Sequence, residues 1–292
     1  MRRRIILSLF FFLFIYFNLK SQDSKAYLSP NIEFLWKSAP ILSTPESVYY
    51  CKNHNVLFVS NINGNPLVKD NNGFISTLTP EGNILELKWV TGLNAPKGMA
   101  VHNDRLYVAD INRIAEIDIV SKAIVKFYVI KGAIFLNDIE IDKNGDIYVS
   151  DMNAKSIYKI SGSKIERWII SKKISNPNGL SISNGFLFVG TSDRILKIQI
   201  KDKSISDYLL NTGNIDGLIY FGIDHIIYSD WEGRIYFTGL GKESMKVIDT
   251  SALKINAADI GFIKEKGIIL VPTFFDNRIM AYRLKMLQNG EQ

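Results

Sequence analysis

Short apolar runs that end in a small residue followed by Asn, Asp or Thr recur along the chain, and this repetition limits the possible fold more than any other feature. The runs are LFVSN at 57, LYVAD at 106, IYVSD at 147, LFVGT at 187, IIYSD at 226 and ILVPT at 269. Successive runs start 49, 41, 40, 39 and 43 residues apart. Repeats of about 40 residues are typical of solenoids and propellers.

Each run belongs to a unit of several short apolar segments. A segment such as MAVH or IEID precedes the run, one such as SIYKI or RILKIQI follows it, and one such as IERWII or ISDYLL usually closes the unit. Four strands in a repeat of this length indicate a propeller blade. Outside the N-terminal segment no stretch has a convincing helical period, so we expect few helices.

The first and last segments of the repeat region complete each other. The sixth unit shows no outer strand after RIMAYRLKM, and IEFLWKS, residues 32–38, stands before the first unit without a partner. Pairing the two would close the ring and leave no open edge between the first and last blades. We therefore predict an all-β, six-bladed propeller over residues 27–286, closed by an N-terminal strand, with an insertion at residues 63–73.

The N-terminus resembles an export signal. MRRR precedes the largely apolar run IILSLFFFLFIYF, residues 5–17, which is shorter than the roughly 20 residues of a membrane-spanning helix. We expect a signal peptide over residues 1–21 and a periplasmic or secreted protein with no stable membrane span after cleavage; an uncleaved anchor is the alternative. The single cysteine, Cys51, cannot form an internal disulfide, which favours a bacterial envelope protein.

The net charge gives no sign of a nucleic-acid partner. The formal charge is +6, but four of the positive charges belong to Arg2, Arg3, Arg4 and Lys20, which leaves +2 for the rest. No stripe of Lys and Arg is interleaved with aromatic residues, as a nucleic-acid groove would require. We expect no nucleic-acid binding.

One residue of each unit stands at the start of the innermost strand when the repeats are aligned. These six residues, called the axial ring below, are Glu46, Lys97, Asn137, Asn178, Asp216 and Ala258. The two inner strands of a blade form an antiparallel hairpin, so the start of the first and the end of the second share one face. Five polar side chains are therefore expected at the narrow centre of the propeller.

The chemistry of the axial ring favours a hard cation. Carboxylates and amides that meet at one point offer only oxygen ligands, which suit Ca²⁺, Mg²⁺ or Mn²⁺ better than a soft metal. We expect one divalent cation, with Ca²⁺ favoured and Mg²⁺, Mn²⁺ or Zn²⁺ as alternatives. The same polar side chains are equally well explained as solvated residues around a water-filled channel or as hydrogen-bonded strand caps. Lys97 is unexpected there, because two unit charges about 8 Å apart interact by roughly 2 kcal/mol at an effective dielectric near 20. Lys97 must bend away, pair with a carboxylate, or contact an anionic substrate.

A second set of polar residues, called the outer circle below, ends the recurring runs. Its members are Asn61, Asp110, Asp151, Thr191, Asp230 and Thr273. Asp and Thr at the start of a turn usually bond to nearby backbone amides, so we favour a structural role. The apolar residues that follow, including Met152, Trp231, Phe274 and Phe275, are candidates for the wall of a pocket.

The three histidines stand away from the axial ring. His54, His102 and His225 all fall in turns between the two inner strands, on the opposite face. A histidine-ligated zinc site or a Ser-His-Asp triad at the ring is therefore not expected.

At the axial ring the sequence resembles the regucalcin/gluconolactonase family of six-bladed propellers, with paraoxonases as more distant relatives. The family's metal-binding glutamate, asparagine and aspartate match Glu46 in TPESVYY, Asn178 in NPNGL and Asp216 in NIDGL. A family asparagine that contacts substrate matches Asn137 in IFLNDIEID. Phe135 replaces the arginine that many lactonases carry two residues earlier, which argues against a sugar-acid lactone.

This resemblance implies a metal-dependent hydrolase of a lactone or ester. Glu46, Asn178 and Asp216 would hold one divalent cation, Asp216 would also act as general base, and Asn137 would orient substrate or water. Lys97, which the family does not account for, would stabilise a developing oxyanion or a substrate carboxylate. The alternative is a non-catalytic periplasmic propeller that binds a ligand or protein partner, with at most a structural cation.

Overall fold

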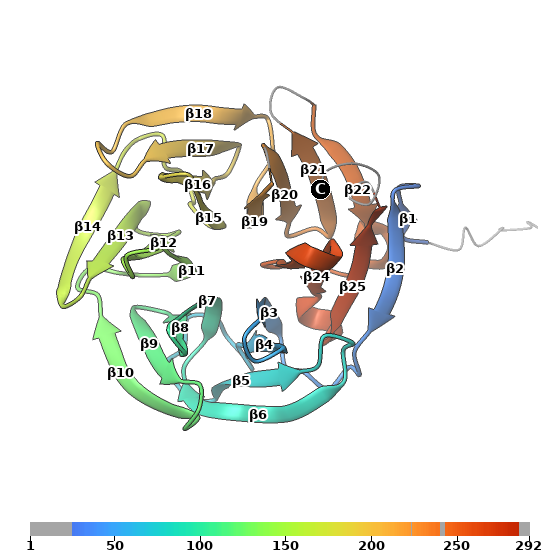
Figure 1. Cartoon of the computed structure of the whole chain (residues 1–292), viewed down its shortest axis with the longest axis horizontal. Helices are drawn as coiled ribbons and strands as arrows, with labels where there is room; N and C mark the ends of the chain where they lie inside the picture. Colours follow the sequence, from blue (N-terminus) through green and yellow to red (C-terminus); the bar gives the residue numbers. More distant parts are fainter. Residues whose placement is uncertain (1–24, 223, 240–242, 286–292) are drawn as a thin grey trace, which may run out of the picture.

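Six antiparallel sheets form a closed ring in the computed structural model, which describes residues 25–222, 224–239 and 243–285 (Figure 1). The innermost strand of each sheet borders the central axis, and the outer strands form the rim. The predicted all-β, six-bladed propeller is therefore confirmed. The predicted signal peptide, residues 1–21, lies outside the described residues.

The blades follow one another in sequence order. Blade 1 contains β3 (Pro45–Cys51), β4 (Val56–Asn61), β5 (Gly73–Leu78) and β6 (Ile84–Leu93). Blade 2 contains β7 (Pro96–His102), β8 (Arg105–Asp110), β9 (Arg113–Asp118) and β10 (Ala123–Val129). Blade 3 contains β11 (Leu136–Ile141), β12 (Ile147–Asp151), β13 (Ser156–Ser161) and β14 (Lys164–Ile170).

The remaining blades have the same order. Blade 4 contains β15 (Leu180–Ser183), β16 (Phe186–Gly190), β17 (Arg194–Gln199) and β18 (Ile205–Leu210). Blade 5 contains β19 (Ile215–Phe221), β20 (His225–Asp230), β21 (Arg234–Gly239) and β22 (Met245–Asp249). Blade 6 contains β23 (Gly261–Ile263), β24 (Ile268–Pro272) and β25 (Ile279–Leu284).

Helical structure in the described ranges is limited to short 3-10 turns. They are η1 (Ser251–Leu253), η2 (Lys264–Lys266) and η3 (Phe274–Asp276). None of these turns has the length or the apolar character that a membrane crossing demands.

Blade 6 is completed by the N-terminal strand β2 (Ile32–Lys37), as predicted. β2 lies beside β25 (Figure 1) and runs antiparallel to it. Phe34 stands opposite Tyr282, and their rings meet edge to face at 5.6 Å. The sequence did not indicate that β1 (Tyr27–Leu28) would add a fifth strand to blade 5 by pairing with β22. Both ends of the repeat region are therefore fixed to the propeller by strand pairing.

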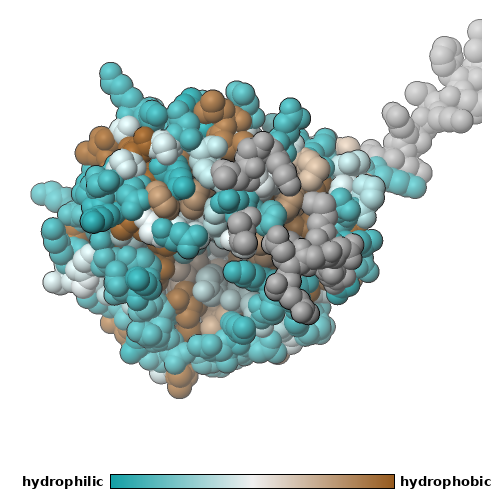
Figure 2. Space-filling model, turned by 45° about the horizontal axis from the view of Figure 1, so that its top comes forward, coloured by the Kyte–Doolittle hydropathy of each residue, from teal (hydrophilic) through white to brown (hydrophobic). Residues whose placement is uncertain are grey.

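The hydrophobic core lies between neighbouring blades rather than inside any one of them. Phe58 and Trp89 of blade 1 pack in one cluster with Met99 and Leu106 of blade 2, and the other main clusters also join adjacent blades. Strand β12 is consequently buried along its whole length, whereas β10 at the rim is mostly exposed. In Figure 2 hydrophilic residues cover most of the visible surface, and hydrophobic residues form separate patches between them.

Candidate functional site

The axial ring occupies equivalent positions in the blades. Glu46, Lys97, Asn137 and Asp216 are the second residues of β3, β7, β11 and β19. Asn178 lies just before β15, where its backbone N–H donates to the carbonyl of Gly190 (3.0 Å) and extends the pairing with β16. The fold thus brings the predicted residues to one end of the inner strands, as the repeat alignment required.

A backbone irregularity accompanies the ring position in four blades. The pairing of the first two strands shifts between Pro45 and Ser47, between Pro96 and Met99, between Leu136 and Ile139, and between Ile215 and Leu218. A β-bulge bends its strand and changes the direction of a side chain. The bulges therefore explain how residues in regular sheets can turn their side chains toward the axis.

Serine hydroxyls satisfy the amides that three of these bulges release from the strand pairing. Ser60 accepts from Ser47 N (3.0 Å), Ser150 from Asp138 N (2.9 Å) and Ser229 from Gly217 N (2.9 Å). These serines are the small residues in the runs LFVSN, IYVSD and IIYSD. The sequence displayed this pattern, but its function is clear only when the bulges are known.

Small residues directly after the ring positions allow the inner strands to approach one another closely. A Cβ added at Gly98 would lie 2.4 Å from Asp138 Oδ1, and one at Gly217 would lie 2.4 Å from the backbone nitrogen of Ile260. Neither contact leaves room for a side chain. Gly98 and Gly217 therefore keep the axis narrow and the ring residues near one another.

Burial and mutual repulsion dominate the electrostatics of the ring. Glu46 and Asp216 are 5% and 7% exposed. Burial, followed by the negative charges of Asp216 and Asp259, raises the pKa of Glu46 well above its usual value, and Lys97 acts in the opposite direction. Burial and the charge of Asp259 raise the pKa of Asp216 to about 7, although a hydrogen bond from Asn178 Nδ2 to Asp216 Oδ1 (3.1 Å) opposes the shift.

The direct contacts of the Lys97 ammonium group are with backbone carbonyls and an aromatic ring. Its Nζ donates to the carbonyls of Ala95 (2.9 Å) and Pro66 (3.3 Å) and lies 4.6 Å from the centroid of the Phe135 ring. Burial lowers the pKa of Lys97 to about 8, while the charges of Glu46 and Asp110 favour its protonated form. Lys97 is thus a fixed positive group at the side of the ring, held by backbone carbonyls and an aromatic face.

Three ring oxygens have no hydrogen-bond partner. They are Glu46 Oε2, Asn137 Oδ1 and Asn178 Oδ1, and among the described residues they are the only buried carboxylate or amide oxygens in this state. A buried polar atom without a partner is costly, and a missing ion is one recognised explanation. The donor set therefore suits a hard cation. No group of three or more His, Cys, Asp and Glu converges in the described ranges, so the amide oxygens would be needed as ligands.

The side chains of the outer circle, in contrast, have hydrogen-bond partners, and the most extensive contacts are those of Asp110 and Asp151. Asp110 Oδ1 accepts from the amides of Asn94 (2.9 Å) and Ala95 (2.8 Å), and its Oδ2 accepts from Arg113 (2.8 Å). Asp151 accepts from the amides of Ile134 (2.7 Å) and Phe135 (3.1 Å). These contacts hold the segments that lead into the ring residues of blades 2 and 3.

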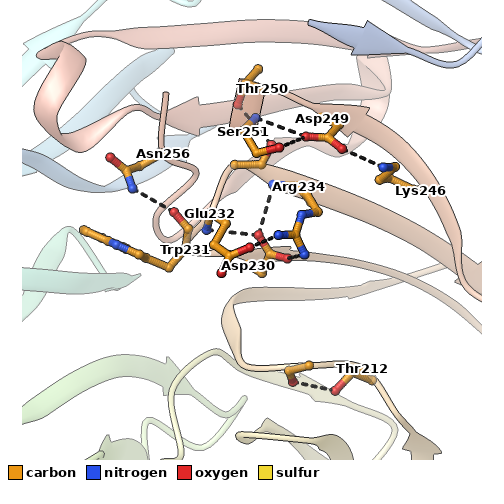
Figure 3. Close-up of polar contacts among 12 residues, drawn as sticks. Thr212, Asp230, Trp231, Glu232, Arg234, Lys246, Asp249, Thr250, Ser251 and Asn256 are labelled. Carbon is orange, nitrogen blue, oxygen red and sulfur yellow. Dashed lines mark hydrogen bonds and ion pairs between the residues drawn. The ribbon is translucent and has the colours of Figure 1, made fainter. Parts of the chain in front are cut away.

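The other members of the outer circle also act as turn caps. Asp230 accepts from the amides of Glu232 (3.0 Å) and Arg234 (3.1 Å) and pairs with the Arg234 side chain (Figure 3). Asn61 accepts from Ser43 N (3.0 Å), and Thr273 accepts from Arg278 N (3.1 Å). The structural role favoured for this circle agrees with these contacts.

A central cavity of about 320 Å³ is lined by the inner strands beyond the ring positions. Asp138, Glu140 and Asp259 contribute carboxyl groups to its wall, and sequence analysis did not identify them. Asp259 Oδ2 accepts from Ser47 Oγ (2.5 Å), and the two oxygens of Asp138 accept from Ile139 N (2.7 Å) and Leu180 N (2.6 Å). The signal in the sequence was an Asp directly after a ring position, in LND and AAD.

The histidines lie at the other end of the blades, as predicted. His102 ends β7 and His225 begins β20, while His54 lies in the turn between β3 and β4. His54 Nε2 contacts Asp104 Oδ1 at 2.8 Å, near the surface. No histidine of the chain is therefore near the axial ring.

Comparison with known proteins identifies the fold. The sequence matches no protein-family model and no curated protein. A streptogramin B lyase structure matches with 16% identity and a TM-score of 0.65, over 89% of this chain and 98% of the lyase. Virginiamycin B lyase from Staphylococcus aureus, a catalytically inactive variant with quinupristin, matches with 14% identity and a TM-score of 0.62, over 89% and 100% of the two chains.

A gluconolactonase from Xanthomonas campestris matches equally well. The identity is 15% and the TM-score 0.63, over 87% of this chain and 89% of that enzyme. Identities this low establish a common architecture and leave the chemistry to the residues of the site. The chain is a six-bladed propeller with the fold that gluconolactonases and streptogramin B lyases share.

Proposed function

We propose that the protein is a divalent-cation-dependent hydrolase of a lactone or ester, exported to the cell envelope. The observation that carries the proposal is the set of unpartnered, buried oxygens on Glu46, Asn137 and Asn178, next to Asp216. Glu46, Asn178 and Asp216 would hold the cation, and Ca²⁺ is the favoured ion. When bound, the cation would polarise the ester carbonyl and stabilise negative charge on its oxygen.

The residues of the chain supply the remaining chemistry. Asn178 occupies Oδ1 of Asp216, so the other oxygen, Oδ2, is the candidate proton acceptor for an attacking water. Asn137 Oδ1 has no partner and would accept a hydrogen bond that orients this water or the substrate. The oxygen of the water would bond to the carbonyl carbon, and the ester C–O bond would break. The proton taken up by Asp216 would then reach the released alkoxide. A lactone would give a hydroxy acid, and an ester would give an acid and an alcohol.

Lys97 would contribute a fixed positive charge. Two of its three protons are directed to the carbonyls of Ala95 and Pro66, so one donor remains for an oxyanion or a substrate carboxylate. This assignment of Lys97 is the least direct of the catalytic roles, because Phe135 covers one side of the ammonium group.

A histidine-dependent reaction of the lyase type has less support. One solved relative in fold is a virginiamycin B lyase that is inactive after a histidine-to-alanine change. All three histidines of the present chain lie at the opposite end of the inner strands. An ester-opening reaction here would therefore depend on the carboxylate and amide groups of the ring.

The second candidate function is a non-catalytic propeller with a structural cation. The tight cover of the ring favours it, since Lys97, Asn137 and Asn178 are only 1–3% exposed. A substrate could reach such groups only if side chains around them moved. Binding of a ligand or protein partner at the surface would need no such movement.

Metal analysis and hydrolysis assays distinguish the two candidates. We expect one divalent cation per chain in the purified protein and turnover of at least one member of a lactone and ester panel. A chelator should stop the turnover, and Asp216→Asn should lose both turnover and the cation. Asp202→Asn, in an exposed turn, is the matched control. Bound cation without turnover would favour the structural role, and metal-free, inert protein would refute the hydrolase.

The export part of the proposal depends on residues 1–21. Sequencing the N-terminus of the protein recovered from the envelope or medium tests it. A mature chain that begins near residue 21 or 22 supports cleavage, whereas an intact N-terminus supports the anchor.

A further inference from the structure

A buried apolar cluster lies beside the axial ring. The residues directly after the outer circle are Ile62, Ile111, Met152, Ser192, Trp231 and Phe274. Ile62, Ile111 and Phe274 pack in one buried cluster with Ala95 and Ala258. Because Ala258 is itself a member of the axial ring, this cluster reaches the axis. On this side, apolar side chains of three blades therefore border the ring.

An aromatic path connects the buried cluster with solvent. The Phe274 ring meets Trp231 edge to face at 4.6 Å and 73°, and it meets Phe275 at 4.8 Å and 84°. Phe274 is 7% exposed, Trp231 36% and Phe275 68%, so exposure increases outward along the three rings. We call Trp231, Phe274 and Phe275 the aromatic mouth.

The aromatic mouth is held in place from two sides. Asn256 Nδ2 donates to the carbonyl of Trp231 (2.8 Å) and ties this loop to the segment that leads into β23 (Figure 3). Phe274 adopts a φ of +49°, in the left-handed region that costs energy for an aromatic residue. Surrounding contacts must offset that cost, so the position of Phe274 is specified rather than incidental.

Few free hydrogen-bonding groups lie beside Asn137 for the hydroxyls of a sugar lactone. Phe135 precedes Asn137 by two residues, its amide is held by Asp151, and its ring faces Lys97 Nζ. Lys97 already donates to two carbonyls. Hydroxyl groups pressed against such apolar surfaces lose their hydrogen bonds to water without replacement, which is unfavourable.

From this arrangement we infer that the substrate is an apolar lactone or ester, whose alkyl or aryl group lies in the aromatic mouth while its carbonyl reaches the axial ring. The inference rests on the proposed hydrolase and specifies the class of its substrate. Burial of each additional methylene is expected to raise kcat/KM by up to about fourfold until the mouth is filled. Polyhydroxylated lactones of similar size should be poor substrates.

Hydrolysis by the mature, Ca²⁺-loaded protein tests the inference directly. The probes are γ-butyrolactone, γ-octalactone, γ-decalactone and glucono-δ-lactone. We expect kcat/KM to rise along the alkyl series and to be lowest for the sugar lactone. Trp231→Ala and Phe275→Ala should reduce the ratio of kcat/KM for γ-decalactone to that for γ-butyrolactone at least tenfold, mainly through the KM for γ-decalactone. Phe275 is the safer variant because its side chain is mostly exposed.

Phe127→Ala is the matched control. Phe127 is 38% exposed, close to the value for Trp231, but it lies on the rim strand β10 against Arg113. The Phe127→Ala variant should show the same increase of kcat/KM with alkyl length as the parent. Equal rates along the series, or better turnover of glucono-δ-lactone, would overturn the inference while the hydrolase remained.

A binding measurement separates failure of the inference from failure of the proposed function. γ-Decalactone should quench tryptophan fluorescence of the chelator-treated protein, and Trp231→Phe should abolish the quenching. If no lactone or ester is hydrolysed but this quenching is present, the hydrolase fails and the apolar binding site stands. If hydrolysis occurs without quenching, the assignment of the aromatic mouth fails.

Discussion

The axial ring and the outer circle are made of similar residues, and both are buried, yet they differ in one respect. The carboxylates of Asp110 and Asp151 accept hydrogen bonds from amides of neighbouring loops. Glu46 and Asn137 lie on the innermost strand of their blades, whereas the outer circle ends the second strand, and each keeps an oxygen without a partner. Folding thus satisfies the polar groups of the outer circle and leaves three ring oxygens without a partner, which is the pattern expected of a binding site.

The two sets are also mechanically linked. Asp110 fixes Ala95, whose carbonyl holds Lys97, and Asp151 fixes Phe135, whose ring faces the same lysine. The satisfied set therefore positions the unsatisfied one. Substitutions in the two sets should separate activity from stability.

The largest expected effect is on activity. If the proposed hydrolase is correct, Glu46→Gln or Asp216→Asn should lower kcat/KM for the best lactone by about 1000-fold or more, because the proposed carboxylate ligand or the proposed proton acceptor is lost. Asp230→Asn, which removes an outer carboxylate in the same blade as Asp216, should change it by less than about tenfold. Steady-state kinetics at saturating Ca²⁺ checks this, and similar losses for both sets would remove the distinction between ring and circle.

Stability should respond in the opposite order. Asp110→Ala leaves Arg113 and two amides without their acceptor, so we expect the free energy of unfolding to fall by about 3 kcal/mol. Saturating Ca²⁺ should leave the difference in unfolding free energy between variant and parent unchanged, since Asp110 is not a proposed ligand. Urea denaturation with and without Ca²⁺ is the measurement. A variant as stable as the parent would mean that the outer circle is not structural.

The buried carboxyl groups around the axis should make stability depend on pH. Burial raises the pKa of Asp259 from 3.8 to about 7, so between these values the folded chain retains a proton that the unfolded chain has lost. The free energy of unfolding of the chelator-treated protein should therefore fall as pH rises from about 4 to 7. For this group the decrease is at most about 1.4 kcal/mol per pH unit. Asp259→Asn should flatten the slope, and a slope of the opposite sign would contradict the raised pKa.

The smallest effect is expected from the serine that satisfies a bulge. Ser150→Ala removes the acceptor of Asp138 N, which should cost about 1 kcal/mol of unfolding free energy. Because the bulge directs Asn137, kcat/KM should also fall by a few fold. Ser161→Ala, at the end of β13, is the control. Unchanged activity with reduced stability would show that the bulge does not direct Asn137.

The architecture was predictable from sequence because each blade of a propeller has the same pattern of buried apolar strands. The runs from Leu57 to Asn61 and from Ile147 to Asp151 both became the second strand of a blade, and the ring positions followed from counting back to the first strand. Closure by residues 32–38 followed from the missing outer strand of the sixth unit. Periodicity and strand count were sufficient for these steps.

The finer features depend on three-dimensional contacts that no local pattern encodes. The direction of Lys97 is set by the carbonyl of Pro66, which belongs to the insertion in blade 1. The role of Ser229 depends on a bulge across the hairpin, and that of Asp259 depends on Ser47, 212 residues away. Backbone irregularities and contacts between distant blades are invisible to a repeat alignment, so these residues required the structure.

Pairing of β2 with β25 has a consequence for the order of events during folding. Glu33 and Arg283, which contact each other across this pair at 3.0 Å, are 250 residues apart in the chain. Strand β2 must remain available until β25, about 250 residues later in the sequence, has been made, and contacts between such distant segments slow folding. Until then the backbone of β2 lacks its pairing partner and is exposed to aggregation, so a chaperone that protects this early strand would raise the yield of native protein.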